Sequence, residues 1–226
     1  MSPSRARPWP LLAAGLLLFA PGRGAADSVV YQGEISADAN RRFFAEVAQC
    51  RPRQLVIDSP GGEVEAGIAL GRWVFDLGLD LVVDGECLSS CANYVFTAAR
   101  RKTVLAGSVV GWHGNYHHLA ATGLWRDEVG TRAARTGEDE ATAEQAVRAQ
   151  VEHLVALERA FFAAIGVDEQ ICWIAKRPPY SVPNYYTLSA ADMARFGVFA
   201  VSLPADYPER EGPDGQRDIP LIRLAP

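Results

Sequence analysis

Short apolar runs alternate along the chain with longer stretches in which apolar residues return every three or four positions. A short apolar run bounded by turn residues is typical of a buried strand, and a period near 3.6 is typical of an amphipathic helix. Strands that alternate with helices in this way indicate an α/β fold, with helices covering a parallel sheet. The pattern predicts strands at residues 28–35, 55–58, 81–83, 103–106 and 109–113, and helices at 37–50, 64–77 and 88–96.

The second half of the chain has a different character. Residues 115–140 mix glycines, polar residues and both kinds of charge, which predicts a long irregular insertion that lines or covers a site. Residues 141–165 carry a broad apolar stripe and predict a helix that ends at Gly166. Residues 189–196 predict a short helix with Ser189 as its N-cap.

Composition narrows the class of protein. The chain has 226 residues, of which 49% are hydrophobic and 22% are charged, enough for one domain with a substantial core. These values exclude a collagen, a coiled coil, a largely disordered chain and a polytopic membrane protein. The net charge is -5 and no long basic stripe occurs, so nucleic acid is not an expected partner.

The N-terminal residues follow the order of a secretory signal peptide. Arg5 and Arg7 precede the apolar run 11–20, and the small residues 24–26 supply a cleavage site. The apolar run is too short to span a bilayer as a helix, because roughly 20 residues are needed. We therefore interpret residues 1–26 as a signal peptide, with an uncleaved anchor and membrane association as the alternative.

Removal of this segment defines the remaining organisation. Residues 27–203 form the folded domain, and residues 204–226 form a polar C-terminal tail that contains several prolines. The protein is then expected to be periplasmic or secreted. No cofactor is expected, because no phosphate-binding glycine loop occurs, and any proteolysis would be independent of ATP.

Four cysteines follow the signal peptide: Cys50, Cys87, Cys91 and Cys172. In an oxidising compartment an even number predicts one or two disulfides, and three full pairings are open. Cys87 and Cys91 would lie near each other if a helix had begun by Cys87, since four residues span about one helical turn.

The residues that suggest chemistry lie between 58 and 113. Residues 58–62, Asp-Ser-Pro-Gly-Gly, stand at a predicted strand-to-helix junction. Two glycines allow positive φ and a close approach by a substrate, and their amides can donate to a carbonyl oxygen, as an oxyanion hole requires. A tight turn with no ligand is the simpler alternative, since such turns are common.

A serine and a histidine follow at two later junctions. Ser89 and Ser90 begin the predicted helix after Gly85, where free amides favour developing negative charge, although either serine can also be a simple N-cap. His113 ends an apolar strand between two glycines. A histidine there can take a proton from a serine and return it to a leaving group.

Taken together, these elements resemble the Clp protease proteolytic-subunit family, a group of serine peptidases with a crotonase-like fold. The shared order is strand, Pro-Gly-Gly, helix, strand, Gly-x-x-x-Ser, helix, strand and His. The resemblance runs from about residue 56 to residue 113 and resumes at residues 187–201. Thirty residues separate Ser59 from Ser89 and 24 separate Ser89 from His113, within a residue or two of the family pattern.

The resemblance implies a ClpP-like α/β fold, a crotonase-like βαβ spiral with a parallel sheet and covering helices. It implies that Ser89 is the nucleophile and His113 the general base, with the amides of Gly62 and Ser90 as oxyanion donors. It also implies a peptide or protein substrate and a homo-oligomeric assembly.

The match fails at the family's catalytic aspartate. The corresponding position falls at residues 184–186, Asn-Tyr-Tyr, which contain no acid. Asn184 is our candidate for the third member, because an asparagine can orient an imidazole although it does not stabilise the imidazolium by charge. Because the aspartate is missing, an alternative function stays open: a crotonase-like binding or assembly module that lacks catalytic activity.

Three other chemistries fit parts of the sequence less well. A lysine base, as in signal-peptide peptidases of the same fold, would need Lys102 or Lys176, and Lys102 adjoins two arginines in a cluster expected to be solvated. Acyl-thioester chemistry occurs on related folds, but coenzyme A is not expected outside the cytoplasm. A zinc site would use residues whose spacing loosely resembles that of zinc ligands: Cys87, Cys91, His113, His117 and His118. Thiols in an exported protein more often form disulfides.

Overall fold

A computed structural model describes residues 28–207 and 219–225. The signal peptide predicted at residues 1–26 lies outside the described residues. One six-stranded sheet runs in the order β1-β2-β3-β4-β7, with β5 paired to the far end of β3, and all its pairings are parallel. Its strands are β1 (Ser28–Gln32), β2 (Gln54–Ser59), β3 (Asp80–Leu88), β4 (Arg101–Val104), β5 (Val109–Gly111) and β7 (Val201–Ser202).

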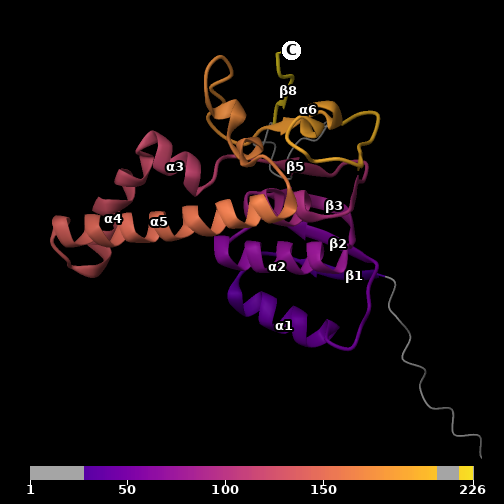
Figure 1. Ribbon diagram of the computed structural model, residues 1–226, viewed down its shortest axis with the longest axis horizontal. Coiled ribbons are helices and arrows are strands. Elements are labelled where there is room, and N and C mark those ends of the chain that lie inside the picture. Colours follow the sequence, from indigo (N-terminus) through magenta and orange to yellow (C-terminus); the bar gives the residue numbers. More distant parts are fainter. Residues whose placement is uncertain (1–27, 208–218, 226) are drawn as a thin grey trace, which may run out of the picture.

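Helices pack against this sheet, which confirms the predicted α/β class with a parallel sheet and covering helices. Figure 1 shows α2 between α1 and the long α5, all three running beside the sheet. Within the described residues the main helices are α1 (Ala37–Val47), α2 (Val64–Leu77), the π-helix η1 (Cys91–Phe96), α3 (Tyr116–Thr122), α4 (Asp127–Thr136), α5 (Glu140–Ile165) and α6 (Ala190–Ala194), with 3-10 turns η2 (Leu124–Arg126), η3 (Glu169–Cys172) and η4 (Ile174–Lys176).

The core forms where strand side chains alternate between buried and exposed. In β2 every second residue is buried, so that Leu55 and Ile57 pack beneath the helices. Capping residues mark the helix ends: the Ser36 hydroxyl accepts from the Ala39 amide at the start of α1, and Gly166 ends α5 in the left-handed conformation, as predicted. No helix among the described residues is both long and apolar enough to cross a bilayer.

The prediction of an irregular insertion at residues 115–140 was wrong, because the segment folds into α3, η2 and α4. Gly123 and Gly137 do not mark irregular chain; each ends a helical turn in the left-handed conformation. These helices are short, and each carries too few apolar residues to be recognised in the sequence. They are stabilised by packing on the first half of α5, around Trp125 and Val129. Figure 1 shows them with α5 as an arm that extends beyond the sheet.

The end of the predicted polar tail is more structured than its composition indicates. Strand β8 (Leu221–Ile222) pairs in parallel with β6 (Thr187–Leu188), and Ile219 is buried beside Leu88. A short apolar run within residues 219–224 provides this contact. The C-terminal strand therefore packs next to the end of β3.

Two glycines let α2 approach η1 closely. A Cβ on Gly71 would lie 2.4 Å from the Tyr94 carbonyl oxygen, and one on Gly67 would lie 2.7 Å from the Tyr94 ring. Such distances are shorter than van der Waals contact, so any larger residue would push the two helices apart. The serine-bearing segment before η1 is therefore held in place by α2.

We expect Gly71→Ala to destabilise the protein by roughly 1–3 kcal/mol, the usual range for an overpacked core. Alanine has the higher helix propensity, but the clash with the Tyr94 backbone exceeds that gain of about 1 kcal/mol. The matched control is Gly130→Ala on exposed α4, where a Cβ meets nothing within 4 Å and stability should rise slightly. Urea unfolding measures both; equal gains in stability would contradict this account.

Candidate active site

The site lies where three parallel strands end. The glycine pair Gly61 and Gly62 follows β2, Ser89 follows β3, and His113 follows β5. Because β2, β3 and β5 are parallel neighbours, their carboxyl ends meet at one edge of the sheet. The fold thereby gathers residues that are far apart in the sequence.

An irregularity in β3 aims its end toward the site. The pairing of β2 with β3 jumps from Ile57–Val83 to Ser59–Cys87, so that residues 84–86 bulge out of the ladder. An Asp58 carboxylate oxygen accepts from the Glu86 amide at 2.8 Å. Gly85 adopts φ 124° against Asp58, where a Cβ would lie 2.3 Å from the carboxylate oxygen. Asp58 and Gly85 are thus structural parts of the site.

Ser89 occupies a sharp turn between β3 and the helix. Its φ is 53°, in the left-handed region that costs an L-residue of order 1–3 kcal/mol. The Ser89 amide donates to the Gly111 carbonyl at 3.0 Å, and the Asn93 amide donates to the Ser89 carbonyl at 2.8 Å. A serine on such a strained strand-to-helix turn exposes its hydroxyl at the edge of the sheet, as in nucleophile elbows.

A disulfide between Cys87 and Cys91 encloses this turn. Cys87 is not helical as the spacing suggested: it belongs to β3, and the Ser89 turn brings the two Cα atoms to 5.1 Å. Cys50 and Cys172 are free thiols and do not form the second disulfide that the even count allowed. Burial raises the pKa of the Cys172 thiol, so it stays protonated.

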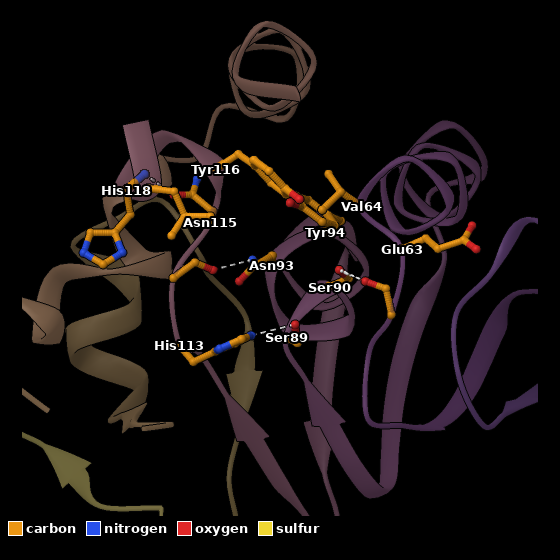
Figure 2. A pocket seen from close by; sticks show the side chains of 13 residues that line it. Glu63, Val64, Ser89, Ser90, Asn93, Tyr94, His113, Asn115, Tyr116 and His118 are labelled. Atoms are coloured by element: carbon orange, nitrogen blue, oxygen red, sulfur yellow. Dashed lines mark hydrogen bonds between the residues drawn. The ribbon is translucent and has the colours of Figure 1, made fainter. Parts of the chain in front are cut away.

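His113 contacts Ser89 directly. Its Nε2 lies 2.8 Å from the Ser89 Oγ (Figure 2). The antiparallel bridge between Trp112 and Tyr186 fixes the backbone just before it, and the Tyr185 ring lies against the imidazole at 4.6 Å between centroids. Desolvation lowers the pKa of His113, and the nearby Lys176 ammonium lowers it further. The imidazole is therefore neutral at neutral pH, the form that a base needs.

The two amides predicted as oxyanion donors border the same space. The Ile35 amide donates to the Gly61 carbonyl and the Glu63 amide donates to the Ile35 carbonyl, so the Gly62 amide faces away from Ile35. The Ser90 hydroxyl donates to the Gly62 carbonyl at 2.7 Å, which joins the two segments. Among the described residues, neither the Gly62 nor the Ser90 amide donates a hydrogen bond.

Asn184 is not brought to His113. Its side chain is exposed, and within residues 28–207 and 219–225 it makes no hydrogen bond with the imidazole. The Asn184 carbonyl instead accepts from Lys176 Nζ at 3.0 Å, as do the carbonyls of Val182 and Pro183 at 3.2 and 2.8 Å. The side chain beside His113 is Tyr185, and the charge that shifts the pKa of His113 is the Lys176 cation.

A cavity of about 320 Å³ opens above Ser89 and His113. The sequence did not single out Asn93 on η1, nor Tyr116 and Leu119 on α3, and α3 lies in the segment predicted as irregular. Asn93, four residues after Ser89, was detectable by its spacing alone. The lining residues are Gly62, Glu63, Val64, Ser89, Ser90, Asn93, Tyr94, His113, Gly114, Asn115, Tyr116, His118 and Leu119.

A buried carboxylate holds this wall together. Glu158 on α5 is fully buried and accepts hydrogen bonds from the Tyr94 hydroxyl at 2.5 Å and from the amides of Tyr116 and His117 at 3.1 and 3.0 Å. Burial raises the pKa of Glu158, and the three donors oppose that rise. The first turn of α3 is thereby fixed to the core.

The structure weakens the Lys102 and zinc alternatives. Lys102 is buried, not solvated as predicted, and burial lowers its pKa to about 8. It pairs with Leu81 near the start of β3, however, while Ser89 follows the other end of that strand. The zinc alternative loses two ligands because Cys87 and Cys91 are oxidised to a disulfide.

No protein-family model matches the chain, and no curated protein sequence matches it. Among solved structures it is similar to ClpP1 from Listeria monocytogenes, with 18% identity and a TM-score of 0.37, over 53% of this chain and 77% of that one. It is similar also to a point mutant of that ClpP1, with 18% identity and a TM-score of 0.34 over the same shares. At this level of similarity, neither neighbour says what this chain does.

We expect replacement of both Cys87 and Cys91 by alanine to lower the free energy of unfolding by about 2 kcal/mol, because the cross-link restricts the unfolded chain over a short loop. Guanidinium unfolding without reductant measures the loss. The control is Cys50→Ala, which removes a half-buried free thiol and should leave stability nearly unchanged. A double variant as stable as the wild type would show that the disulfide contributes nothing.

Proposed function

We propose that this protein is an exported serine hydrolase that cleaves peptide bonds, independently of ATP, through a Ser89–His113 dyad. One observation carries the proposal: His113 Nε2 lies 2.8 Å from the hydroxyl of a serine held in a left-handed strand-to-helix turn. A simple N-cap serine would need neither the strained φ nor the histidine contact. Export is supported by the buried disulfide, since such bonds persist in oxidising compartments.

The proposed reaction follows from the positions of the donors and acceptors. His113 Nε2 takes the proton from Ser89 Oγ as the oxygen attacks the substrate carbonyl carbon. The amides of Gly62 and Ser90 donate to the oxyanion of the tetrahedral intermediate. The imidazolium then protonates the leaving amine, and a water molecule, activated by the same histidine, hydrolyses the acyl-enzyme.

The electrostatic environment of His113 predicts slow turnover. No carboxylate of the described residues hydrogen-bonds to the imidazole, and the charge of Lys176 acts against its protonation. An uncharged partner in place of the aspartate costs about 10⁴ in kcat in a well-studied serine protease. We therefore expect the acylation step to be measurable with reactive probes before turnover is measurable with peptides.

The same electrostatics favours one alternative, a binding or assembly module that keeps the shape of the site without catalysis. Such a module would bind peptides at the strand ends and would not acylate Ser89. The homo-oligomer that the family resemblance implies remains a prediction under either function.

A fluorophosphonate serine probe tests the proposal. The folded, oxidised wild type should be labelled, and Ser89→Ala and His113→Ala should each lose labelling by at least about 10³-fold, because nucleophile and base act as a unit. Ser202→Ala, at an exposed serine on β7, is the control and should label normally. A wild type that is never labelled would reject catalysis, and labelling lost only in Ser90→Ala would move the nucleophile by one residue.

The rate of labelling should also depend on pH in a defined way. Because the pKa of His113 lies below its ordinary value of 6.5, the labelling rate should stay high as the pH is lowered to 6.5 and should fall only at lower pH. Lys176→Met removes the cation, so the pKa of His113 should rise and the acid limb should move to higher pH. Lys176→Arg keeps the charge and should leave the limb in place; equal profiles for all three proteins would contradict the assigned cause.

A further inference from the structure

The backbone places Tyr185 opposite His113. Trp112 and Tyr186 form an antiparallel bridge, in which each amide donates to the other residue's carbonyl at 2.9 Å. In an antiparallel pair the residue after one partner faces the residue before the other, so His113 and Tyr185 lie opposite each other. The side chains of Trp112 and Tyr186 are fully buried in the core. Because side chains alternate between faces, those of His113 and Tyr185 share the other face.

A glycine on β5 leaves room for the tyrosine ring. Gly111 lies two residues before His113, so a side chain there would point to the same face as the imidazole. A Cβ on Gly111 would lie 3.3 Å from a ring carbon of Tyr185. The ring therefore lies over the position that a side chain at residue 111 would fill. It also packs against a small apolar cluster made of Leu88, Val109 and Ile219.

The C-terminal segment completes this cluster. Ile219 is buried and lies just before β8, which pairs with β6 in parallel. The Thr187 amide donates to the Pro220 carbonyl at 3.0 Å and ties this segment to the chain that follows Tyr185. Leu88, a second member of the cluster, directly precedes Ser89. The cluster thus adjoins both halves of the Ser89–His113 pair.

His113 needs support of this kind because its hydrogen bonding restrains it at one atom. The imidazole reaches from its strand end toward Ser89 (Figure 2), and the Ser89 Oγ is its only hydrogen-bond partner within residues 28–207 and 219–225. In serine proteases an acid bonded to Nδ1 fixes the tautomer and the orientation of the ring. The χ2 torsion of a histidine is broad, so one bond through Nε2 does not fix the ring plane. A second ring packed against the imidazole restricts that torsion.

We propose that Tyr185 is the positioning residue of His113: its ring, supported by the cluster that contains Ile219, holds the imidazole toward the Ser89 hydroxyl in place of an orienting acid. This inference rests on the proposed function. The ring supplies orientation and no negative charge, so the slow turnover expected of the site is unchanged. The C-terminal residues 219–222 become a supporting part of the site, although the sequence predicts them as part of a polar tail.

Tyr185→Leu tests the role of the ring, because leucine keeps an apolar side chain on the cluster and removes the flat surface against the imidazole. The rate of labelling by the fluorophosphonate probe is measured against probe concentration. The maximal rate should fall by roughly ten- to a hundredfold, the cost of a misplaced catalytic group. The probe concentration that gives half of this rate should stay nearly constant, since binding is not affected. Tyr185→Phe keeps the ring and should label much faster than Tyr185→Leu.

Two further comparisons separate positioning from structural damage. Asn184→Ala changes an exposed side chain in the same loop and should label as the wild type does. Ile219→Ala should lower the maximal rate, by less than Tyr185→Leu, and it tests the same support if Tyr185→Leu fails to fold. Its matched control is Ile222→Ala on β8, which removes the same atoms where the side chain packs on the main core, and which should leave the rate unchanged.

Several outcomes would overturn the proposal. One is a wild-type rate in Tyr185→Leu, and another is an equal loss in Tyr185→Phe or Asn184→Ala. A loss expressed only in the half-saturating probe concentration would assign Tyr185 to binding and would also overturn it. So would equal rates for Ile219→Ala and Ile222→Ala.

Nitrogen NMR of the histidine rings distinguishes these failures from failure of the proposed function. The chain has four histidines, and the signal missing in His113→Ala identifies the one of interest. At a pH where the imidazole is neutral, an Nε2 that accepts from Ser89 leaves the proton on Nδ1. The wild type and Tyr185→Phe should show this single tautomer, and Tyr185→Leu should show a mixture.

The NMR result is informative whether or not the protein is active. If the wild type is never labelled, this pattern still supports positioning by Tyr185, whereas mixed tautomers in the wild type would overturn it. An active enzyme in which Tyr185→Leu changes neither the tautomer nor the labelling rate keeps the proposed function and rejects the role of Tyr185.

Discussion

The left-handed turn at Ser89 is the constraint on which the site depends. An L-residue does not keep this conformation unless its surroundings enforce it. Here the turn is enforced from three sides: the Ser89 amide is bound by Gly111, the disulfide joins Cys87 to Cys91, and Gly61 packs so closely that a Cβ would lie 2.5 Å from the Leu88 carbonyl oxygen. These restraints come from β5, from the turn itself and from the loop after β2, so the hydroxyl position requires the sheet to be assembled.

Much of this arrangement was predictable, because its signals are local. A glycine pair, a serine and a histidine each follow an apolar run, and parallel strands bring such positions together. What depends on tertiary packing was not predictable. The disulfide partner of Cys87 is set by the Ser89 turn, and α3 and α4 exist only because α5 covers their short apolar stripe. Lys102 is buried although its neighbours in the sequence are arginines.

The environment of His113 at the position of the missing aspartate was also not predictable from the sequence. The sequence indicated that an acid is missing, and Asn184 was the natural substitute. In the structure Asn184 is exposed, and Lys176 binds the carbonyls of the loop that carries it. A lysine that organises a loop through three carbonyls cannot be recognised from sequence spacing. Its second effect, a positive charge near His113, arises only from the fold.

The geometry of the site suits the proposed catalysis, whereas the charges around His113 do not. The Ser89–His113 contact and the free amides of Gly62 and Ser90 supply the geometry that the proposed acylation needs. The lowered pKa of His113 favours the neutral base before attack but disfavours the imidazolium that forms during it. Under the proposed function, the rate would therefore come from positioning and from the oxyanion donors more than from the basicity of His113.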